Sequence, residues 1–549
     1  MKDKIKNYSE YKLYVILYMI AFISWLISIY TTHVTNIIPN DFLGIVSKLP
    51  MFFFVAILLT IIAMKQAHDD NHTKTFATGL LLIVIILFLT YPVIEPNASF
   101  AVSYYPSGMA TQILESGHIS TEFSYEGYVY LYYTGFQIFT STLLAITNIE
   151  LDFVIKYFYV FFVFIIVMFV AITYKFLSKN WNFAIIGTLL FISFFWSEQI
   201  YYGPQLFSFL LMCTLFFVFI KYTEYNNVSL VVIATLIFLS ISFTHILIGL
   251  MIVIFLFVIN ISFFTNKNST KLKYFFIPFT VIYITWFVNM AFPFFKYSIA
   301  TVFESLNDVD THIKSVTLGR TIFGETINET IIFNVRLFFI AMNFILVTVA
   351  IYNYLKTRER NKLYDVVIFW IVSVFLLLFI SYGGEIILRI YLYSLVGSSF
   401  FITYLFRKIN NSIVLFSILT LFLILNPIAF VGDESIKLVS DSEIVGSKFF
   451  VKTTINNTEV FYTGGGAIMK YLDGSSNRRT SGFWAPANKT QFNISRKYDY
   501  VVSSEIGSNV AYYYLNYDPV SEQMRNQSYK DYYILYNNMN FITYKRKNT

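Results

Sequence analysis

The sequence predicts an all-α polytopic membrane protein of about thirteen transmembrane helices with a small C-terminal α/β domain. Of its 549 residues, 57% are hydrophobic, 20% are aromatic and only 13% are charged, and the mean hydropathy is +0.62. Soluble domains carry about 25% charged residues, so this chain cannot cover a water-facing surface of its size. Its aromatic content excludes a disordered chain. The lone Cys213 excludes an internal disulfide and a cysteine-based zinc cluster.

Apolar stretches of transmembrane length recur along the first four fifths of the chain. A helix needs about 20 apolar residues to cross the hydrocarbon core. The run behind the polar residues 1–12 is too long for a signal-peptide core and has no small-residue cleavage site, so we read it as a retained first helix. The predicted spans lie near 13–30, 46–64, 77–93, 153–174, 183–198, 205–220, 228–243, 246–264, 275–292, 332–354, 366–380, 386–405 and 413–430.

Basic residues predict which side of the membrane each segment faces. With residues 1–12 in the cytoplasm and the spans alternating, most lysines and arginines before residue 431 fall on the inner side, including the strongly basic 356–362. The positive-inside rule therefore predicts a multi-pass protein of the cell (plasma) membrane with a cytoplasmic N-terminus and its tail outside. The basic residues then left outside before residue 431 are Lys48, Lys156, Lys296, Lys314 and Arg320.

The stretch 129–147 is also apolar, but it fits this arrangement only if it does not cross. A crossing there would move Lys175 and Lys179, and every second basic cluster up to 356–362, to the outer side. We therefore expect 129–147 to lie along the outer surface or to re-enter, where its tyrosines suit the interface.

The chain divides into three parts on composition. Residues 1–12 form the N-terminal segment, and residues 13–430 form the membrane core, which includes long outer loops at 94–152 and 293–331. The tail, 431–549, is polar, with short apolar pieces separated by glycine-containing turn signals. We expect the tail to be a small mixed α/β domain on the outer face.

Polar and ionisable residues gather near the predicted outer ends of the spans. Such residues cost about 2.5–3.5 kcal/mol at the centre of a helix in the membrane, so they need partners. Their common depth predicts an outward-opening cavity for a ligand with a phosphate and hydroxyls, because arginine binds phosphate oxygens bidentately and a carboxylate can act as a base toward a hydroxyl. The residues concerned are Glu95, Glu198, Gln205, His245, Arg336, Glu385 and Arg389.

Each of these residues also has a structural interpretation. Glu385 and Arg389 are four positions apart and can form a simple ion pair on one helix face. His245 can be a satisfied turn residue, and Arg336 can extend toward the outer headgroups. Nucleic-acid binding is not expected, because the basic residues form short clusters between apolar stretches rather than one basic face.

Several short motifs resemble the GT-C superfamily of polytopic membrane glycosyltransferases, in particular its archaeal members. The stretch YYPSGMATQILESGHI at 104–119 resembles their first outer loop, and 130–149 resembles the helix beside the membrane that follows it. Further motifs similar to that group are Tyr202-Gly203-Pro204-Gln205, Phe243-Thr244-His245, and Glu385 with Arg389.

The resemblance implies transfer of a sugar from a polyprenyl-phosphate-linked donor to an acceptor on the outer face. Arg389 would hold the lipid phosphate, with Arg336 as a second candidate. The family's acidic residue normally stands just before the quoted phrase, where this chain has no carboxylate at 101–106. Glu95, at the end of the preceding span, is the substitute we expect to act as base or to bind a divalent cation. The remaining candidates are Glu198 as a catalytic group, and Glu385, His245, Gln205 and His118 as substrate-binding groups.

Two other functions remain open on the sequence. A transporter of lipid-linked glycans would need polar groups along a whole route and two related halves. A non-catalytic scaffold working with partner glycosyltransferase subunits would explain the missing acidic residue in the first outer loop. In every case membrane lipids surround the core.

Overall fold

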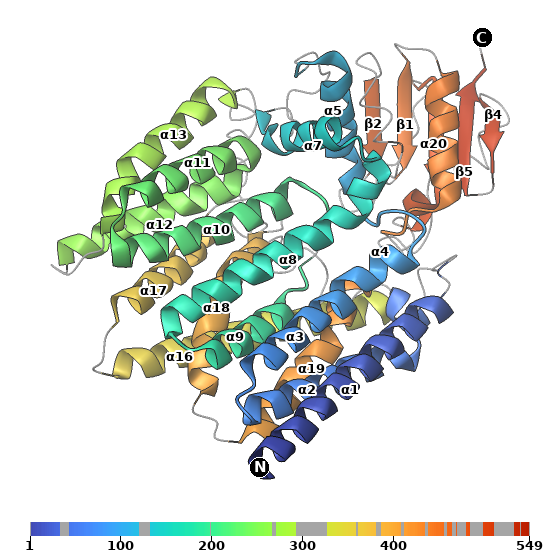
Figure 1. Cartoon of the computed structure of the whole chain (residues 1–549). Helices are drawn as coiled ribbons and strands as arrows, with labels where there is room; N and C mark the ends of the chain where they lie inside the picture. Colours follow the sequence, from blue (N-terminus) through green and yellow to red (C-terminus); the bar gives the residue numbers. More distant parts are fainter. Residues whose placement is uncertain are drawn as a thin grey trace.

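The computed structural model describes most of the membrane core and parts of the tail (Figure 1). The described residues are 2–32, 34, 43–119, 132–197, 199–265, 271–292, 327–357, 361–379, 386–407, 411–433, 437–454, 458–463, 468, 479–483, 498–509, 532–538 and 540–547.

In this part of the chain ten helical segments are long and apolar enough to cross a membrane. Together with the small sheet near the C-terminal end, they confirm the predicted fold class. The segments are α1 (Lys2–Thr31), α2 (Met51–Asp69), the run of α3 (Thr73–Val84), η2 (Ile85–Leu89) and α4 (Thr90–Ile94), α8 (Leu151–Ser178), α10 (Pro204–Tyr225), η4 (Lys271–Phe275) with α13 (Phe276–Asn289), α16 (Ile327–Lys356), α17 (Lys362–Phe375) with η5 (Leu376–Phe379), α18 (Ile386–Phe406) and α19 (Ser412–Val431).

Shorter apolar helices occupy the other three predicted spans. They are α9 (Trp181–Phe194), α11 (Val228–Thr244) and α12 (Ile246–Thr265), the last apolar over Ile246–Ser262. The side chains of α9 are buried from Phe183 to its end. A helix enclosed by other helices has little contact with lipid, so α9 can be shorter than the hydrocarbon core is thick.

The helix α2 begins five residues later than the predicted 46–64. Pro50 is the N-cap of α2, and the preceding Gly44–Lys48 forms the separate 3₁₀ turn η1. Proline lacks an N–H group and is tolerated only at the start of a helix. The apolar pattern alone therefore placed the start too early.

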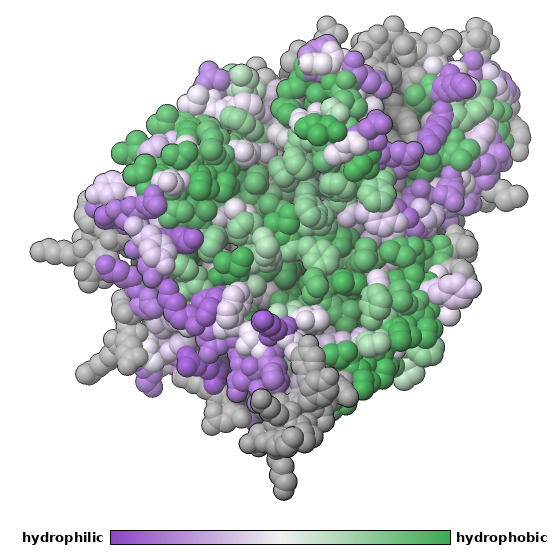
Figure 2. Space-filling view, viewed as in Figure 1, coloured by the Kyte–Doolittle hydropathy of each residue, from purple (hydrophilic) through white to green (hydrophobic). Residues whose placement is uncertain are grey.

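The membrane helices run between two opposite faces of the molecule. On one face the ends of α2, α9 and α19 meet through Asn71–Asn182 and Asp69–Ser412 hydrogen bonds. We call this the basic face, because the exposed Lys65 and Lys179 side chains lie there. On the other face, the tail face, the Trp25 indole N–H donates to Thr90 and Arg336 to the Ala429 carbonyl. Figure 2 shows hydrophobic side chains between polar side chains at the two ends.

Two helices of the first long loop lie at the tail face, α5 (Tyr104–Ser116) and α7 (Gly135–Thr147), after the short 3₁₀ turn η3 (Ala101–Ser103). Figure 1 shows α7 lying across the ends of neighbouring helices, beside α5. Its 13 residues extend about 20 Å, less than the roughly 30 Å of the hydrocarbon core. Residues 132–147 of this stretch are described, and the expectation that it lies along the outer surface or re-enters stays a prediction.

The tail contains α20 (Asp441–Thr453) and a five-stranded mixed sheet in the order β2-β1-β3-β5-β4. The strands β1, β2 and β3 are parallel, whereas β3 with β5 and β4 with β5 are antiparallel. The apolar pieces at Val501–Val502 and 532–536 fall on β3 and β4. The strand bounds are β1 (Glu459–Thr463), β2 (Arg479–Phe483), β3 (Tyr500–Ser504), β4 (Tyr532–Asn537) and β5 (Phe541–Arg546).

Packing between α20 and the sheet fixes the tail domain. Ser440 caps α20 by accepting from the Glu443 N–H, as an N-cap serine does. Phe450 of α20 is fully buried with Val460, Val502 and Phe541 of the sheet. Gly446 lies directly over the Phe541 ring, where a Cβ atom would come within 2.3 Å of a ring carbon. This close approach places α20 along one face of the sheet, as Figure 1 shows.

Candidate functional site

Three of the predicted site residues meet at the tail face. Arg389 lies in the first turn of α18, and Gln205 is the second residue of α10. His245 is the C-cap of α11, in the tight turn that leads into α12. Proline at N1 begins α10 just before Gln205, and the β-region backbone of His245 ends α11. The Gln205 and His245 side chains therefore stand at helix ends.

The Arg389 guanidinium joins this group, which we call the Arg389 cluster. Its Nη1 donates to Gln205 Oε1 at 2.5 Å and lies 3.4 Å from His245 Nε2. Exposure is 8% for Arg389, 4% for Gln205 and 8% for His245. The other ring nitrogen of His245, Nδ1, accepts from the Ile248 N–H at 3.4 Å, so the ring is held from both sides.

Gln205 also presents a donor inside the cluster. Its Nε2 is buried and has no hydrogen-bond partner among the described residues. Buried amide groups are nearly always hydrogen-bonded, so such an atom calls for an explanation. With Arg389 beside it, the cluster offers a cation and an amide N–H, which are groups that bind phosphate oxygens.

Glu95 lies at the C-terminal end of α4, on the tail face. It is the C-cap residue, its N–H donates to the Tyr91 carbonyl, and its exposure is 2%. Glu95 is therefore a buried carboxyl at the end of the span that enters the first long loop. Its role as base stays a prediction.

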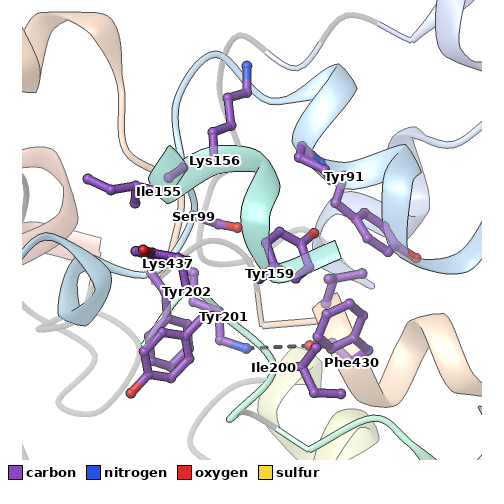
Figure 3. Close-up of a pocket in the computed structure, with 14 residues that line it drawn as sticks. Tyr91, Ser99, Ile155, Lys156, Tyr159, Ile200, Tyr201, Tyr202, Phe430 and Lys437 are labelled. Carbon is purple, nitrogen blue, oxygen red and sulfur yellow. Dashed lines mark hydrogen bonds between the residues drawn. The ribbon is translucent and has the colours of Figure 1, made fainter. Parts of the chain in front are cut away.

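A pocket opens between the ends of α4 and α19 and the start of α8. Figure 3 shows its aromatic lining, with Tyr91 and Tyr159 on one side and Tyr201 and Tyr202 on the other. The two lysines among its lining residues are Lys156 and Lys437. Tyr202 is three residues before Gln205, so the Cα atoms of these two residues are at most about 11 Å apart.

Arg336 lies in a different group from Arg389. Its Nη2 is 3.0 Å from Asp433 Oδ1, its Nε donates to the Ala429 carbonyl at 2.8 Å, and its guanidinium is 5.7 Å from the centre of the Trp196 ring. Lys437 Nζ is 2.7 Å from the same Asp433 oxygen. Exposure of Arg336, Asp433 and Lys437 is 7%, 1% and 6%. These contacts give Arg336 a structural role between α16 and the tail linker, and its predicted role in substrate binding stays a prediction.

Sequence reasoning missed Asp433 and Lys437. Both follow the last span, in a stretch that composition assigned to a polar, water-facing tail. Their spacing of four positions was the available signal, because it lets an acidic and a basic side chain pair on one turn. Nothing in their spacing indicated burial.

The remaining predicted site residues are not brought into these groups. His118 is exposed just beyond α5, and its ring Nδ1 contacts the Ser116 carbonyl at 3.1 Å. Glu198 and Glu385 lie outside the described residues, so their predicted roles stay predictions. Most of the outer loop 293–331 also lies outside them.

A cation site was tested on the described residues. Across those parts of the chain, no three histidine, cysteine, aspartate or glutamate side chains come together in a way that could hold a metal ion. A divalent cation therefore stays an expectation from the resemblance.

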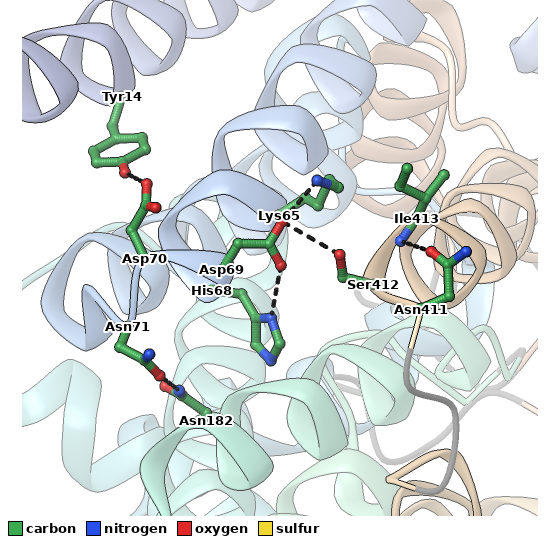
Figure 4. A network of polar contacts seen from close by, with 10 residues as sticks. All are labelled: Tyr14, Lys65, His68, Asp69, Asp70, Asn71, Asn182, Asn411, Ser412 and Ile413. Atoms are coloured by element: carbon green, nitrogen blue, oxygen red, sulfur yellow. Dashed lines mark hydrogen bonds and ion pairs between the residues drawn. The ribbon is translucent and has the colours of Figure 1, made fainter.

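A second polar network, on the basic face, is structural (Figure 4). Asp69 pairs with Lys65 at 2.6 Å and accepts from Ser412 at 3.2 Å, which links α2 to α19. Asn182 donates to Asn71, which links the α2–α3 turn to α9. This network fastens helix ends, because its members are helix-terminal and partly exposed.

Comparison with known proteins gives limited information. No protein-family model matches the chain, and no curated protein matches it. The chain is similar to a crystal structure of the Archaeoglobus fulgidus oligosaccharyltransferase in complex with zinc and sulfate. That likeness covers 85% of this chain and 72% of the other, at 11% identity and a TM-score of 0.49. A likeness at this level identifies neither an activity nor a ligand.

Proposed function

We propose that the protein is a membrane glycosyltransferase that moves a sugar from a polyprenyl-phosphate-linked donor to an acceptor on the outer face of the cell membrane. The observation that carries the proposal is the buried Arg389 cluster at the tail face, where one cation and one amide donor converge from different helices. An arginine buried at the end of a membrane span is costly unless it serves a partner or a ligand.

The chemistry follows from a donor phosphate held at Arg389. The acceptor oxygen forms a bond to the anomeric carbon of the sugar while the bond from that carbon to the phosphate oxygen breaks. The departing polyprenyl phosphate keeps the electron pair, and Arg389 and Gln205 stabilise its charge. Glu95 takes the proton from the acceptor hydroxyl. Electrostatic stabilisation of the leaving group is the largest contribution expected from this arrangement.

The phosphate-binding step is tested with purified full-length protein and two probes, decaprenyl phosphate and decaprenol, which lacks the phosphate. Wild type should bind decaprenyl phosphate more tightly than the alcohol. R389Q should weaken phosphate binding about tenfold or more, since a charge-assisted hydrogen bond is worth roughly 1.5–3 kcal/mol. R407Q is the matched control, because Arg407 follows the opposite end of α18 and is exposed. Equal binding by R389Q and R407Q would remove the proposed phosphate site.

The transfer step has its own variant. In membranes supplied with a radiolabelled polyprenyl-phosphate hexose, E95Q should retain lipid-phosphate binding and lose release of label to acceptor. Loss of binding together with loss of release would instead assign Glu95 to the structure of α4. A wild-type protein that binds the donor and releases no label in membranes containing the acceptor pool would favour the scaffold alternative.

A further inference from the structure

We propose that the pocket between α4, α8 and the linker after α19 binds the phosphate of an anionic membrane phospholipid, whose chains lie along α4 and α8. This site is separate from the Arg389 cluster, and it does not depend on the proposed transferase activity. The argument rests on the cations in the pocket, on its walls and on the apolar surface beside it.

Two ammonium groups among the lining residues supply the positive charge. Lys437 is 6% exposed, and its Nζ contacts the Phe430 carbonyl at 3.4 Å (Figure 3). Its carboxylate partner, Asp433, also pairs with Arg336, so a single negative charge is shared by two cations. Lys156, from the second turn of α8, donates to the Pro96 carbonyl, which is a neutral partner. Asp433 is not among the lining residues.

The wall formed by the first long loop is held in an unusual backbone conformation. Phe100 has φ +76°, a value that residues other than glycine rarely adopt. Its N–H donates to the Lys437 carbonyl at 2.9 Å, and its ring stacks on Tyr201 at 4.7 Å between centroids. Such strain persists only where surrounding contacts hold it, and it concentrates at ligand sites. Here those contacts fix Phe100 over the Lys437 ammonium, 5.1 Å from its ring centre.

The neighbouring surface selects a lipid as the occupant. Val93 is 40% exposed and Phe153 is 50% exposed, one on each of the two helices that flank the pocket. The Tyr159 hydroxyl donates to the Phe88 carbonyl, so α8 packs directly against the run of α3, η2 and α4. Lysines and tyrosines at the end of apolar helices match the headgroup level of a bilayer, where an ammonium group can pair with a lipid phosphate. The enclosed space is small, which disfavours a sugar ring.

The test uses the full chain in neutral detergent and measures lipid retention by native mass spectrometry. The probes are phosphatidylglycerol, zwitterionic phosphatidylcholine, decaprenyl phosphate and inorganic phosphate. We expect wild type to retain phosphatidylglycerol in preference to phosphatidylcholine, and K156Q to weaken its retention about tenfold. K48Q, which removes an exposed tail-face lysine outside the pocket, should retain the lipid as wild type does.

Further variants separate the outcomes. K437Q should weaken the retention of phosphatidylglycerol as K156Q does. K437Q also disturbs a buried ion pair, so K156Q decides the result if K437Q does not fold. R389Q should keep the lipid, which distinguishes this site from the donor site. Equal retention of the two phospholipids, or identical behaviour of K156Q and K48Q, would overturn the proposal. If wild type retains decaprenyl phosphate more strongly than phosphatidylglycerol and K156Q abolishes that retention, the phospholipid is not the occupant. If inorganic phosphate alone saturates the pocket, the ligand is not a lipid.

Discussion

At the scale of single residues, Asp433 is a buried carboxylate that pairs with two basic side chains. It lies between Arg336 of α16 and Lys437 of the tail linker, and its side chain is 2% exposed. Removing one partner from a buried ion pair leaves charge without compensation, which costs more than the pair itself contributes. Asp69, on the basic face, also pairs with a lysine, but its side chain is 35% exposed.

We expect D433N to destabilise the protein by about 3–5 kcal/mol, because it leaves two buried cations without their shared carboxylate. D69N, the matched substitution in an exposed pair, should cost no more than about 1 kcal/mol. Thermal unfolding midpoints of the two variants in the same detergent measure the difference. Similar midpoints would show that the Asp433 pairs contribute little net stability.

At the scale of elements, α7 shows how a short apolar helix is held against a neighbouring helix. Its first residue, Gly135, lies against the end of α11, where a Cβ atom would come within 2.4 Å of Thr244 Oγ1 and 3.1 Å of the Phe243 carbonyl. Thr244 directly precedes His245 of the Arg389 cluster. The position of α7 is therefore coupled to the geometry of the candidate site.

Substituting G135V should force α7 away from α11 and cost about 1–3 kcal/mol, as overpacking a close contact does. A145V adds bulk to the exposed side of the same helix and should stay within about 0.5 kcal/mol of wild type. Denaturation in detergent compares the two variants, and hydrogen exchange in α7 locates the change. A destabilisation by A145V as large as that by G135V would point to helix propensity rather than to the contact.

At the scale of the whole molecule, the two ends of the helix bundle differ in chemistry. The basic face carries lysines such as Lys65, Lys74 and Lys179, whereas the tail face carries α5, α7 and the sheet domain (Figures 1 and 2). The positive-inside rule places such a basic face in the cytoplasm. We therefore propose that the tail domain lies outside the cell.

This orientation is tested by single-cysteine labelling in intact cells, in a background where the buried Cys213 is replaced by alanine. A membrane-impermeant maleimide should label N540C, on the exposed turn of the tail sheet, and should label K74C only after the membrane is opened. The reverse pattern would place the tail in the cytoplasm and would contradict transfer on the outer face.

The sequence predicted the fold closely because hydropathy is a local property. Each of the predicted spans corresponds to an apolar helix. Errors arose where backbone chemistry interrupts an apolar pattern, as at Pro50 before α2. Of the candidate site, the depth of the polar residues could be predicted, but their partners could not.

By itself, the sequence determined that this is a multi-span membrane protein with a separate polar tail, because apolar length and charge content leave no other stable arrangement. Only the tertiary structure decided which polar residues meet. Arg389 is 184 positions from Gln205 and 144 from His245, and Arg336 pairs with Asp433 rather than with that cluster. Such pairings depend on how helices distant in sequence pack together, and the residue pattern of a single helix does not specify which helices it contacts.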